Sequence, residues 1–201
     1  MSNAQDTLQA WPSNLGIFEP YCRHETPLIL KLREKRLSLT GDSFEITTVD
    51  GQGFLKANPS LVSFVGKKVL VDPASGNPVL TITQKPLSLH KEFRIFAGDS
   101  DSEQLVTVRG KFKLFGSPEM MVHFRNRSDG KEMELHIKGE FFRRNATISC
   151  EGRTIATIKN KILNSGELFF DQQTYFLTVA PRVDSAMIAA ICICLDERRE
   201  K

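Results

Sequence analysis

Near the C-terminus, residues 186–195 read AMIAAICICL, ten consecutive residues without a polar side chain. Asp184 precedes this run at the position of an N-cap and charged residues from Asp196 onward follow it, so the pattern predicts a helix over about residues 184–195. At helical spacing its apolar side chains point all round the axis, which is typical of a helix buried in a protein core or in lipid. Ten residues rise only about 15 Å, half of a hydrocarbon layer of about 30 Å. The helix is therefore expected inside the protein and not across a membrane.

From Leu28 onward the chain consists of short runs with period two, separated by turn residues. The clearest run is residues 133–138, MELHIK, in which apolar and polar residues alternate strictly, as in a strand with one buried face. Pairs such as Asp129-Gly130 supply the positive φ angles of tight hairpins. The runs number roughly a dozen, which indicates an all-β sandwich or barrel.

The buried helix limits the kind of barrel. A helix with its side chains is about 10–12 Å across, whereas a barrel of about eight strands has room only for its own side chains. Larger closed barrels do hold a central helix, and the strand count is of that order. We therefore predict a closed antiparallel β-barrel around the C-terminal helix, formed by residues 28–201. The proline-containing residues 1–27 are expected to form an irregular arm.

Composition excludes several classes of protein. The 201 residues are 40% hydrophobic and 25% charged, as in ordinary globular domains, and the net charge of +3 is too small to suggest a dedicated nucleic-acid binder. The four cysteines lack the spacing of a disulfide framework or a zinc site. The first residues show no secretory signal, so a reducing, cytoplasmic location is expected. A closed barrel has no free edge to drive association, and a monomer is the default expectation.

Three segments resemble the LURP-one-related family, which belongs to the wider tubby C-terminal and phospholipid scramblase superfamily. They are residues 71–79 (VDPASGNPV), residues 85–96 (KPLSLHKEFRIF), and residues 179–188 around the predicted start of the helix. Phe93 departs from the pattern, because family members often carry Trp there. The resemblance extends from about Leu28 to Asp196.

This resemblance implies a closed barrel of about twelve strands around a hydrophobic C-terminal helix. Tubby domains bind phosphoinositides, scramblases act on membrane lipids, and plant LURP-one-related proteins are linked to defence against pathogens. None of these activities carries over through a shared catalytic motif.

Residue patterns for catalysis or metal binding are weak. Residues 99–103 (DSDSE) alternate acidic side chains, but a calcium loop needs Gly and Glu where Gln104 and Gly110 stand, which favours a solvated turn. Cys192 and Cys194, two apart on a helix, project in nearly opposite directions and read as core residues. The histidines at 90, 123 and 136 are scattered. We predict no catalytic residue, no metal and no cofactor.

Basic residues leave one functional question open. A phosphate site needs Lys or Arg side chains that converge, and residues on the same face of neighbouring strands can do this. The alternative is solvated charge that protects a β surface. The candidates for an anion or phosphoinositide site are Lys111, Lys113, Arg143, Arg144, Lys159 and Lys161.

Our leading hypothesis is a non-enzymatic intracellular binding module that engages phosphoinositide-bearing or other anionic membrane surfaces as a peripheral protein. The second is a protein-interaction or regulatory domain without a lipid role, which would use the arm or a loop such as residues 97–104. The third, an enzyme or scramblase, requires a concave site with convergent polar groups. Because the helix fills the barrel, any ligand is expected outside it or at a rim.

Overall fold

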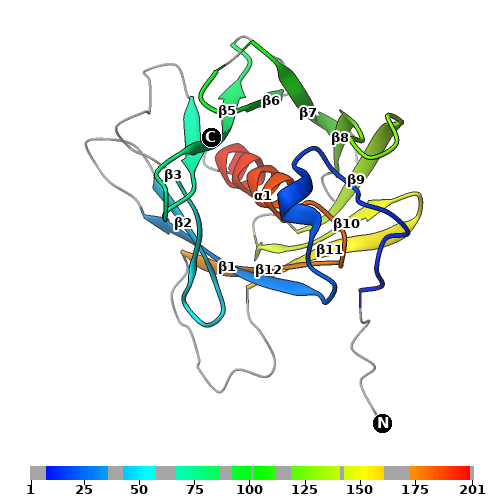
Figure 1. The fold of residues 1–201 in the computed structure, drawn as a ribbon, viewed down its shortest axis with the longest axis horizontal. Helices are drawn as coiled ribbons and strands as arrows, with labels where there is room; N and C mark the ends of the chain where they lie inside the picture. Colours follow the sequence, from blue (N-terminus) through cyan, green and yellow to red (C-terminus); the bar gives the residue numbers. More distant parts are fainter. Residues whose placement is uncertain are drawn as a thin grey trace.

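The barrel predicted from the sequence is present. The computed structural model describes residues 8–35, 43–57, 67–86, 92–100, 102–111, 119–140, 143–160 and 173–199. In these ranges the chain forms one closed antiparallel barrel of twelve strands around a C-terminal helix (Figure 1). The strands are β1 (Leu28–Lys35), β2 (Ser43–Thr48), β3 (Gly53–Ala57), β4 (Lys68–Val71), β5 (Pro78–Gln84), β6 (Phe93–Ala97), β7 (Gln104–Lys111), β8 (Glu119–Arg125), β9 (Glu132–Glu140), β10 (Asn145–Cys150), β11 (Arg153–Lys159) and β12 (Thr174–Val179).

Every strand pairs with its neighbours in the sequence, and β1 closes the barrel against β12, where Leu30 lies opposite Leu177. Side chains alternate between the interior and the outer wall. In β9, Leu135 and Ile137 are fully buried, whereas Glu134 and His136 are only half-buried. Closure leaves no free strand edge. The outer wall and the two rims are therefore the surfaces available to a ligand.

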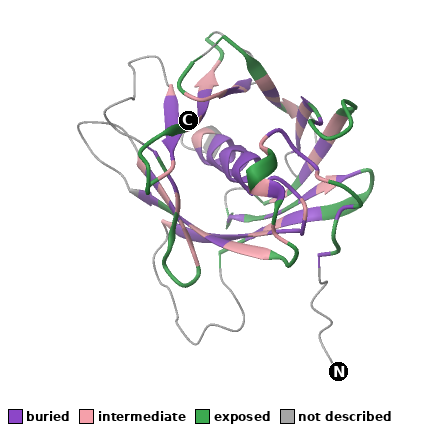
Figure 2. Cartoon of the chain, viewed as in Figure 1, coloured by how far each residue is buried: buried purple, intermediate pink, exposed green. Residues whose placement is uncertain are grey.

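The central helix, α1 (Ser185–Arg199), runs through the middle of the barrel (Figures 1 and 2). Asp184 is its N-cap, because the Met187 N–H donates to Asp184 Oδ1 at 2.9 Å. Each residue from Ala186 to Cys194 is 0% exposed, as its apolar circumference predicts. The helix extends to Arg199, beyond the predicted end at Leu195, and the carboxylates of Asp196 and Glu197 in its last turn lie next to cations. Among the described residues, no helix is long and apolar enough to cross a membrane.

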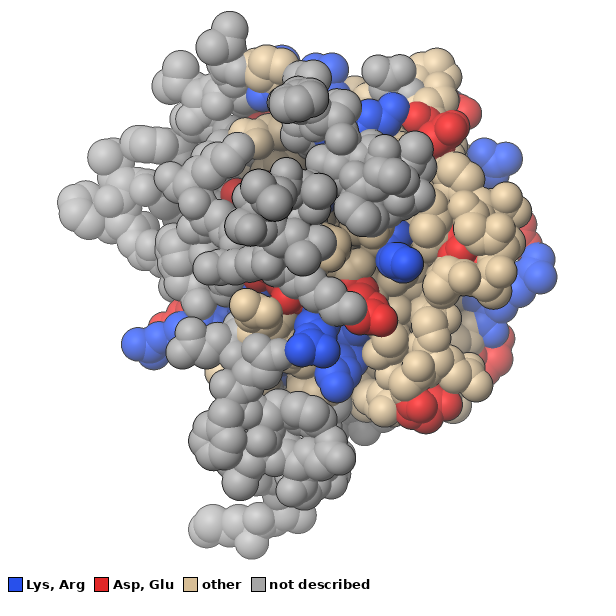
Figure 3. All heavy atoms as spheres, turned by 90° about the vertical axis from the view of Figure 1, so that its left-hand side faces the viewer, with Lys and Arg blue, Asp and Glu red and all other residues tan. Residues whose placement is uncertain are grey.

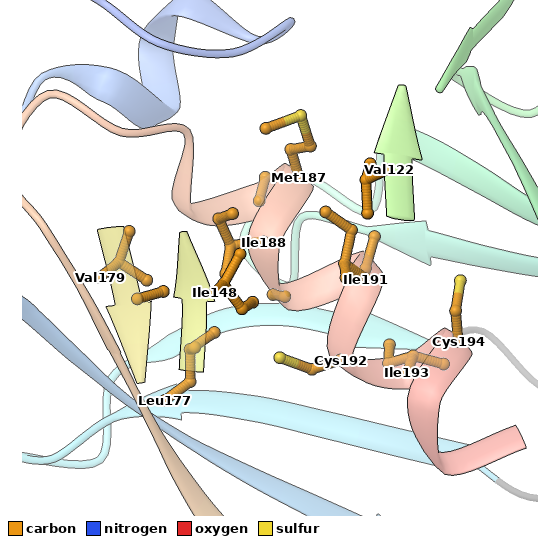
Figure 4. Packing of buried hydrophobic residues seen from close by; sticks show 14 of the residues in the cluster. Val122, Ile148, Leu177, Val179, Met187, Ile188, Ile191, Cys192, Ile193 and Cys194 are labelled. Carbon is orange, nitrogen blue, oxygen red and sulfur yellow. The ribbon is translucent and has the colours of Figure 1, made fainter. Parts of the chain in front are cut away.

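The helix side chains reach the wall on several sides. Figure 4 shows Ile191 pointing toward Val122 of β8 and Cys192 pointing toward Leu177 of β12. Burying one isoleucine side chain of this kind contributes about 1.5–3 kcal/mol. The strands thus close around an apolar axis to which each side of the barrel contributes.

Residues 8–22 cover the end of the barrel at which α1 begins, which we call the arm end. Leu15 is fully buried and bridges to Val183: the Leu15 N–H donates to the Arg182 carbonyl at 2.9 Å, and the Asp184 N–H donates to the Leu15 carbonyl at 2.8 Å. A short 3-10 helix, η1 (Glu19–Cys22), follows. Apart from η1, residues 8–22 are irregular, and backbone hydrogen bonds pack them onto the barrel.

The carboxylate of Asp184 joins the arm to the helix. Its Oδ2 accepts the N–H groups of Ile17 at 3.0 Å and Phe18 at 2.6 Å. Burial raises the pKa of this carboxyl to about 6, against the lowering effect of its backbone hydrogen bonds. Gly16 has a φ of +148° and a Cβ there would collide with Asp184, so only glycine fits the approach.

Candidate anion-binding surface

Three of the six basic residues proposed from the sequence have described side chains, and these three do not share one environment. Arg143 and Lys159 are exposed, and Arg143 Nη1 lies 3.4 Å from Glu140 Oε2. Lys111 is the last residue of β7, but its side chain lies outside the described residues, as do Lys113 and Lys161. That these residues converge on one ligand stays a prediction.

Arg144 points into the protein at the end of the barrel where α1 ends, which we call the ionic end. Its φ of +51° differs from that of an ordinary strand residue, and its side chain is 6% exposed. Its Nη2 lies 2.9 Å from Glu34 Oε2, its Nε lies 3.6 Å from Asp196 Oδ1, and its Cζ lies 4.7 Å from the centre of the Tyr175 ring. This guanidinium thus joins β1, β12 and the end of α1 and is not presented on the outer wall.

A small cavity adjoins this buried ion pair. Its volume of about 10 Å³ has room for about one water molecule. Burial raises the pKa of the Tyr175 hydroxyl well above its usual value, and the charge of Asp196 is the second-largest cause of this increase. The lining residues are Arg144, Ala146, Ile158, Tyr175, Cys192, Leu195 and Asp196. A space of this size cannot admit a lipid headgroup.

On the outer wall, three cations surround one carboxylate. We call Lys85, Glu92, Arg94 and Arg109 the Glu92 cluster. Arg94 Nε lies 3.2 Å and Lys85 Nζ 3.7 Å from Glu92 Oε1, and Arg109 Nε lies 2.9 Å from Glu92 Oε2. The Glu92 side chain is 10% exposed, whereas those of Lys85, Arg94 and Arg109 are 44%, 36% and 57% exposed. The cations thus cover the carboxylate and face solvent themselves.

Strand alternation produces this arrangement. Phe93 and Ile95 are buried in the core, so Arg94 between them projects outward from β6. Val108 is buried in the same way, which turns Arg109 of β7 outward. The Lys85 N–H donates to the Glu92 carbonyl at 2.8 Å, which extends the β5–β6 pairing by one step.

The electrostatics of the cluster are asymmetric. Burial opposes the ionisation of Glu92, but the hydrogen bond from Arg94 and the charges of Arg109 and Lys85 outweigh it and hold the pKa of this carboxyl below its usual value. Three cations and one carboxylate leave two positive charges on this part of the wall. Convergent, partly exposed guanidinium and ammonium groups of this kind suit an anion with several oxygens, such as a phosphate.

A second group of polar side chains lies on the same wall, on β8 and β9, the two strands that follow β7. We call His123, Glu134 and His136 the His cluster. His123 Nδ1 lies 3.4 Å from Glu134 Oε2, and His136 Nε2 lies 2.9 Å from Glu134 Oε1. From the sequence, these histidines were interpreted as scattered. The pairing of β8 with β9 instead places His123 directly opposite Glu134. Among the described residues, His, Cys, Asp and Glu side chains form no group of three that could hold a metal ion.

The side of the molecule that carries β2 and β3 shows charges of both signs (Figure 3). On the side of the molecule that carries β2 and β3, the Lys and Arg side chains lie near Asp and Glu, without a continuous area of one sign (Figure 3). The cysteines offer no reactive alternative, because Cys22, Cys150, Cys192 and Cys194 are all buried. Burial raises the pKa of the Cys22 thiol to about 12 and that of Cys150 to about 11, which disfavours the nucleophilic thiolate.

The fold defines the class of protein: a twelve-stranded closed barrel with a buried C-terminal helix and a polar outer wall. Comparison with protein-family models matches residues 28–196 to the LURP-one-related family, and the chain belongs to this family. The first barrel strand, β1, and the family match begin at the same residue, Leu28.

Three Arabidopsis thaliana proteins illustrate the relationship. The chain is 28% identical to protein LURP-one-related 15 over 174 residues, which are 85% of this chain and 80% of the relative. It is 26% identical to protein LURP-one-related 10 over 187 residues, or 91% and 96% of the two chains. It is 29% identical to protein LURP1 over 181 residues, or 88% and 86%. The similarity thus covers at least 85% of this chain in each case.

Proposed function

We propose that this protein is a non-enzymatic binding module that attaches to anionic, phosphate-bearing membrane headgroups, including phosphoinositides, through the Glu92 cluster. The observation that carries the proposal is the convergence of Lys85, Arg94 and Arg109 on one nearly buried carboxylate. Glu92 holds the cations in place before a ligand arrives, so less side-chain freedom is lost on binding. Lys111, one of the residues proposed from the sequence, lies two positions beyond Arg109 on β7.

The surface favours attachment by charge over insertion. Among the described residues, the large hydrophobic side chain that is exposed is Val49, at 58%. The barrel interior is filled by α1 and its wall residues, and the cavity beside Arg144 is water-sized. A headgroup therefore binds on the wall, and we expect the attachment to weaken as salt screens the charges.

Vesicle co-sedimentation tests this proposal. The full chain is mixed with vesicles of phosphatidylcholine alone, with added phosphatidylglycerol, or with added phosphoinositide, at about 0.15 M salt. We expect binding to both anionic compositions and not to phosphatidylcholine. The double variant Arg94→Gln/Arg109→Gln should bind about 30-fold more weakly, since each cation near an anionic surface contributes about 1 kcal/mol.

The matched control is Arg23→Gln/Lys131→Gln. It removes the same charge from side chains that are 71% and 75% exposed, each next to a single carboxylate. We expect this control to bind like the wild type, and thermal melting checks that both double variants are folded. If the wild type does not bind anionic vesicles, or if the two double variants weaken binding equally, the Glu92 cluster is not a headgroup site. The first of these results would favour the protein-interaction hypothesis, which a pull-down with and without residues 1–27 then examines.

A further inference from the structure

We propose that the His cluster is the proton-dependent half of the same surface, so that anionic headgroups bind more tightly at mildly acidic pH. The inference rests on the proposed function, because it assigns a regulator to that site. Histidine is the side chain whose charge ordinarily changes between pH 5 and 8. Two histidines held next to a set of fixed cations can therefore change the charge of the surface within the physiological range.

Strand pairing places the two clusters side by side. Thr107 of β7 lies opposite Arg94 of β6 on one side and opposite His123 of β8 on the other. In the next row, Met121 of β8 lies between Arg109 of β7 and His136 of β9. His123 lies on the strand next to that of Arg109, and along each row the histidine and the arginine are two strands apart, about 10 Å at the usual strand spacing. That separation is about one Debye length in physiological salt, so the charges of both clusters act on one multivalent anion or on one patch of headgroups.

Protonation changes the sign of the His cluster. With both imidazoles neutral, Glu134 gives the cluster one negative charge, which opposes anions near Arg94 and Arg109. With both protonated, the cluster carries one net positive charge, a change of two. The Glu92 and His clusters together then change from +1 to +3.

Both histidines contact the same carboxylate, and all three side chains are reached by solvent. Glu134 offers one carboxylate oxygen to each ring, and a charged imidazolium strengthens both contacts. The side chains of His123, His136 and Glu134 are 43%, 41% and 38% exposed, so a headgroup can approach them.

The other groups that face the histidines are either uncharged or compensated by a neighbour of opposite sign. Thr107 and Met121 separate the histidines from the arginines, and Ser149 of β10 lies opposite His136 and donates to its carbonyl at 3.4 Å. The remaining charged residues of these three strands are Arg109 and Lys111 on β7, Glu119 and Arg125 on β8, and Glu132, Lys138 and Glu140 on β9. Lys138 Nζ lies 3.8 Å from Glu119 Oε1, and Arg125 lies opposite Glu132. Among the described residues of β6 to β9, His123 and His136 are therefore the side chains of the type whose charge ordinarily changes near neutral pH.

The test measures affinity for phosphatidylglycerol vesicles at about pH 5.5 and about pH 7.5, a range that spans histidine titration. Phosphatidylglycerol is chosen because its phosphodiester keeps its charge over this range, whereas a phosphoinositide monoester does not. We expect the wild type to bind about tenfold more tightly at the lower pH. In the variant His123→Gln/His136→Gln, binding at about pH 7.5 should persist and the pH dependence should largely disappear.

His24→Gln is the matched control, because His24 lies at the arm end, with Nε2 at 2.9 Å from the Val183 carbonyl. It should keep the pH dependence of the wild type, and thermal melting at both pH values verifies folding. Binding that is equal at the two pH values, or a pH dependence that survives in His123→Gln/His136→Gln, overturns this inference and leaves the proposed function standing. Absence of binding at both pH values overturns the proposed function itself.

Discussion

The two ends of the barrel are closed by different interactions. At the arm end, residues 8–22 add main-chain hydrogen bonds and apolar side chains such as Leu15 and Trp11 to the start of α1. At the ionic end, side chains perform this role: Arg144 meets Glu34 and Asp196, and Lys68 Nζ lies 2.8 Å from Glu197 Oε1. The arm end buries one carboxylate among backbone donors, whereas the ionic end buries charges that compensate one another.

The two ends of a helix need different partners when the helix is held inside a barrel. A helix N-terminus offers unpaired N–H groups, which a carboxylate cap and an extended segment can satisfy. The last turn of α1 instead carries Asp196 and Glu197, whose charges are stable in a buried setting only next to cations. The arm end is therefore sensitive to the protonation of Asp184, and the ionic end to the loss of a cation.

The largest effect is expected where both ends depend on the same element. Ile191→Asp places a carboxylate at a helix position that is 0% exposed and faces the wall. We expect a loss of more than about 5 kcal/mol in the free energy of unfolding, because an unpaired charge is buried. Expressed protein should collect in the insoluble fraction. Ile191→Val, with an expected cost of about 0.5–1.5 kcal/mol, is the control. Unchanged thermal stability of Ile191→Asp would mean that α1 is not the core of the barrel.

At the ionic end, Arg144→Met should cost about 3–5 kcal/mol, measured by chemical denaturation. The substitution keeps an apolar stem but takes the guanidinium away from two buried carboxylates. The triple variant Glu34→Met/Arg144→Met/Asp196→Leu should recover much of this loss, since well-packed apolar groups often replace a buried ion cluster without cost. An Arg144→Met protein as stable as the wild type would show that the ion pairs do not hold this end.

At the arm end we expect the contribution of Asp184 to the free energy of unfolding to change by about 3 kcal/mol with pH. The folded carboxyl of Asp184 has a pKa raised to about 6, so it keeps its proton where an unfolded aspartate, with a pKa of about 3.9, has lost it. The stability from this group is thus fully present below about pH 4 and is lost as pH rises through about 6. Denaturation of the wild type and Asp184→Asn at about pH 4 and about pH 7 measures it. The free energy of unfolding of the wild type, relative to that of Asp184→Asn, should decrease from about pH 4 to about pH 7. A difference that stays constant or increases contradicts the expectation.

Much of the fold followed from local sequence patterns. The apolar run before Asp196 predicted a buried helix, and Asp184 was correctly placed as its N-cap. The alternating run at residues 133–138 lies within β9, as predicted. These features are local, because periodicity and capping depend on residues a few positions apart.

The side-chain clusters were less accessible to prediction. Arg143 and Arg144 are adjacent and chemically identical, yet one is exposed and the other is buried, because the turn before β10 gives Arg144 a positive φ. The Glu92 cluster joins residues from 85 to 109 in the sequence. Alternation along the strand predicts that Arg94, between Phe93 and Ile95, points outward. The proximity of Arg94 to Arg109, however, depends on the register between β6 and β7.

A short helix that is apolar on every side needs a barrel of many strands to enclose it, and this could be inferred from a single segment because its length and apolar circumference are local properties. The charges that meet at the ionic end, the cations around Glu92 and the sharing of Glu134 by His123 and His136 came only from the folded structure. Charged side chains act over a few ångströms, and those distances are set by strand register and by the closure of β1 on β12.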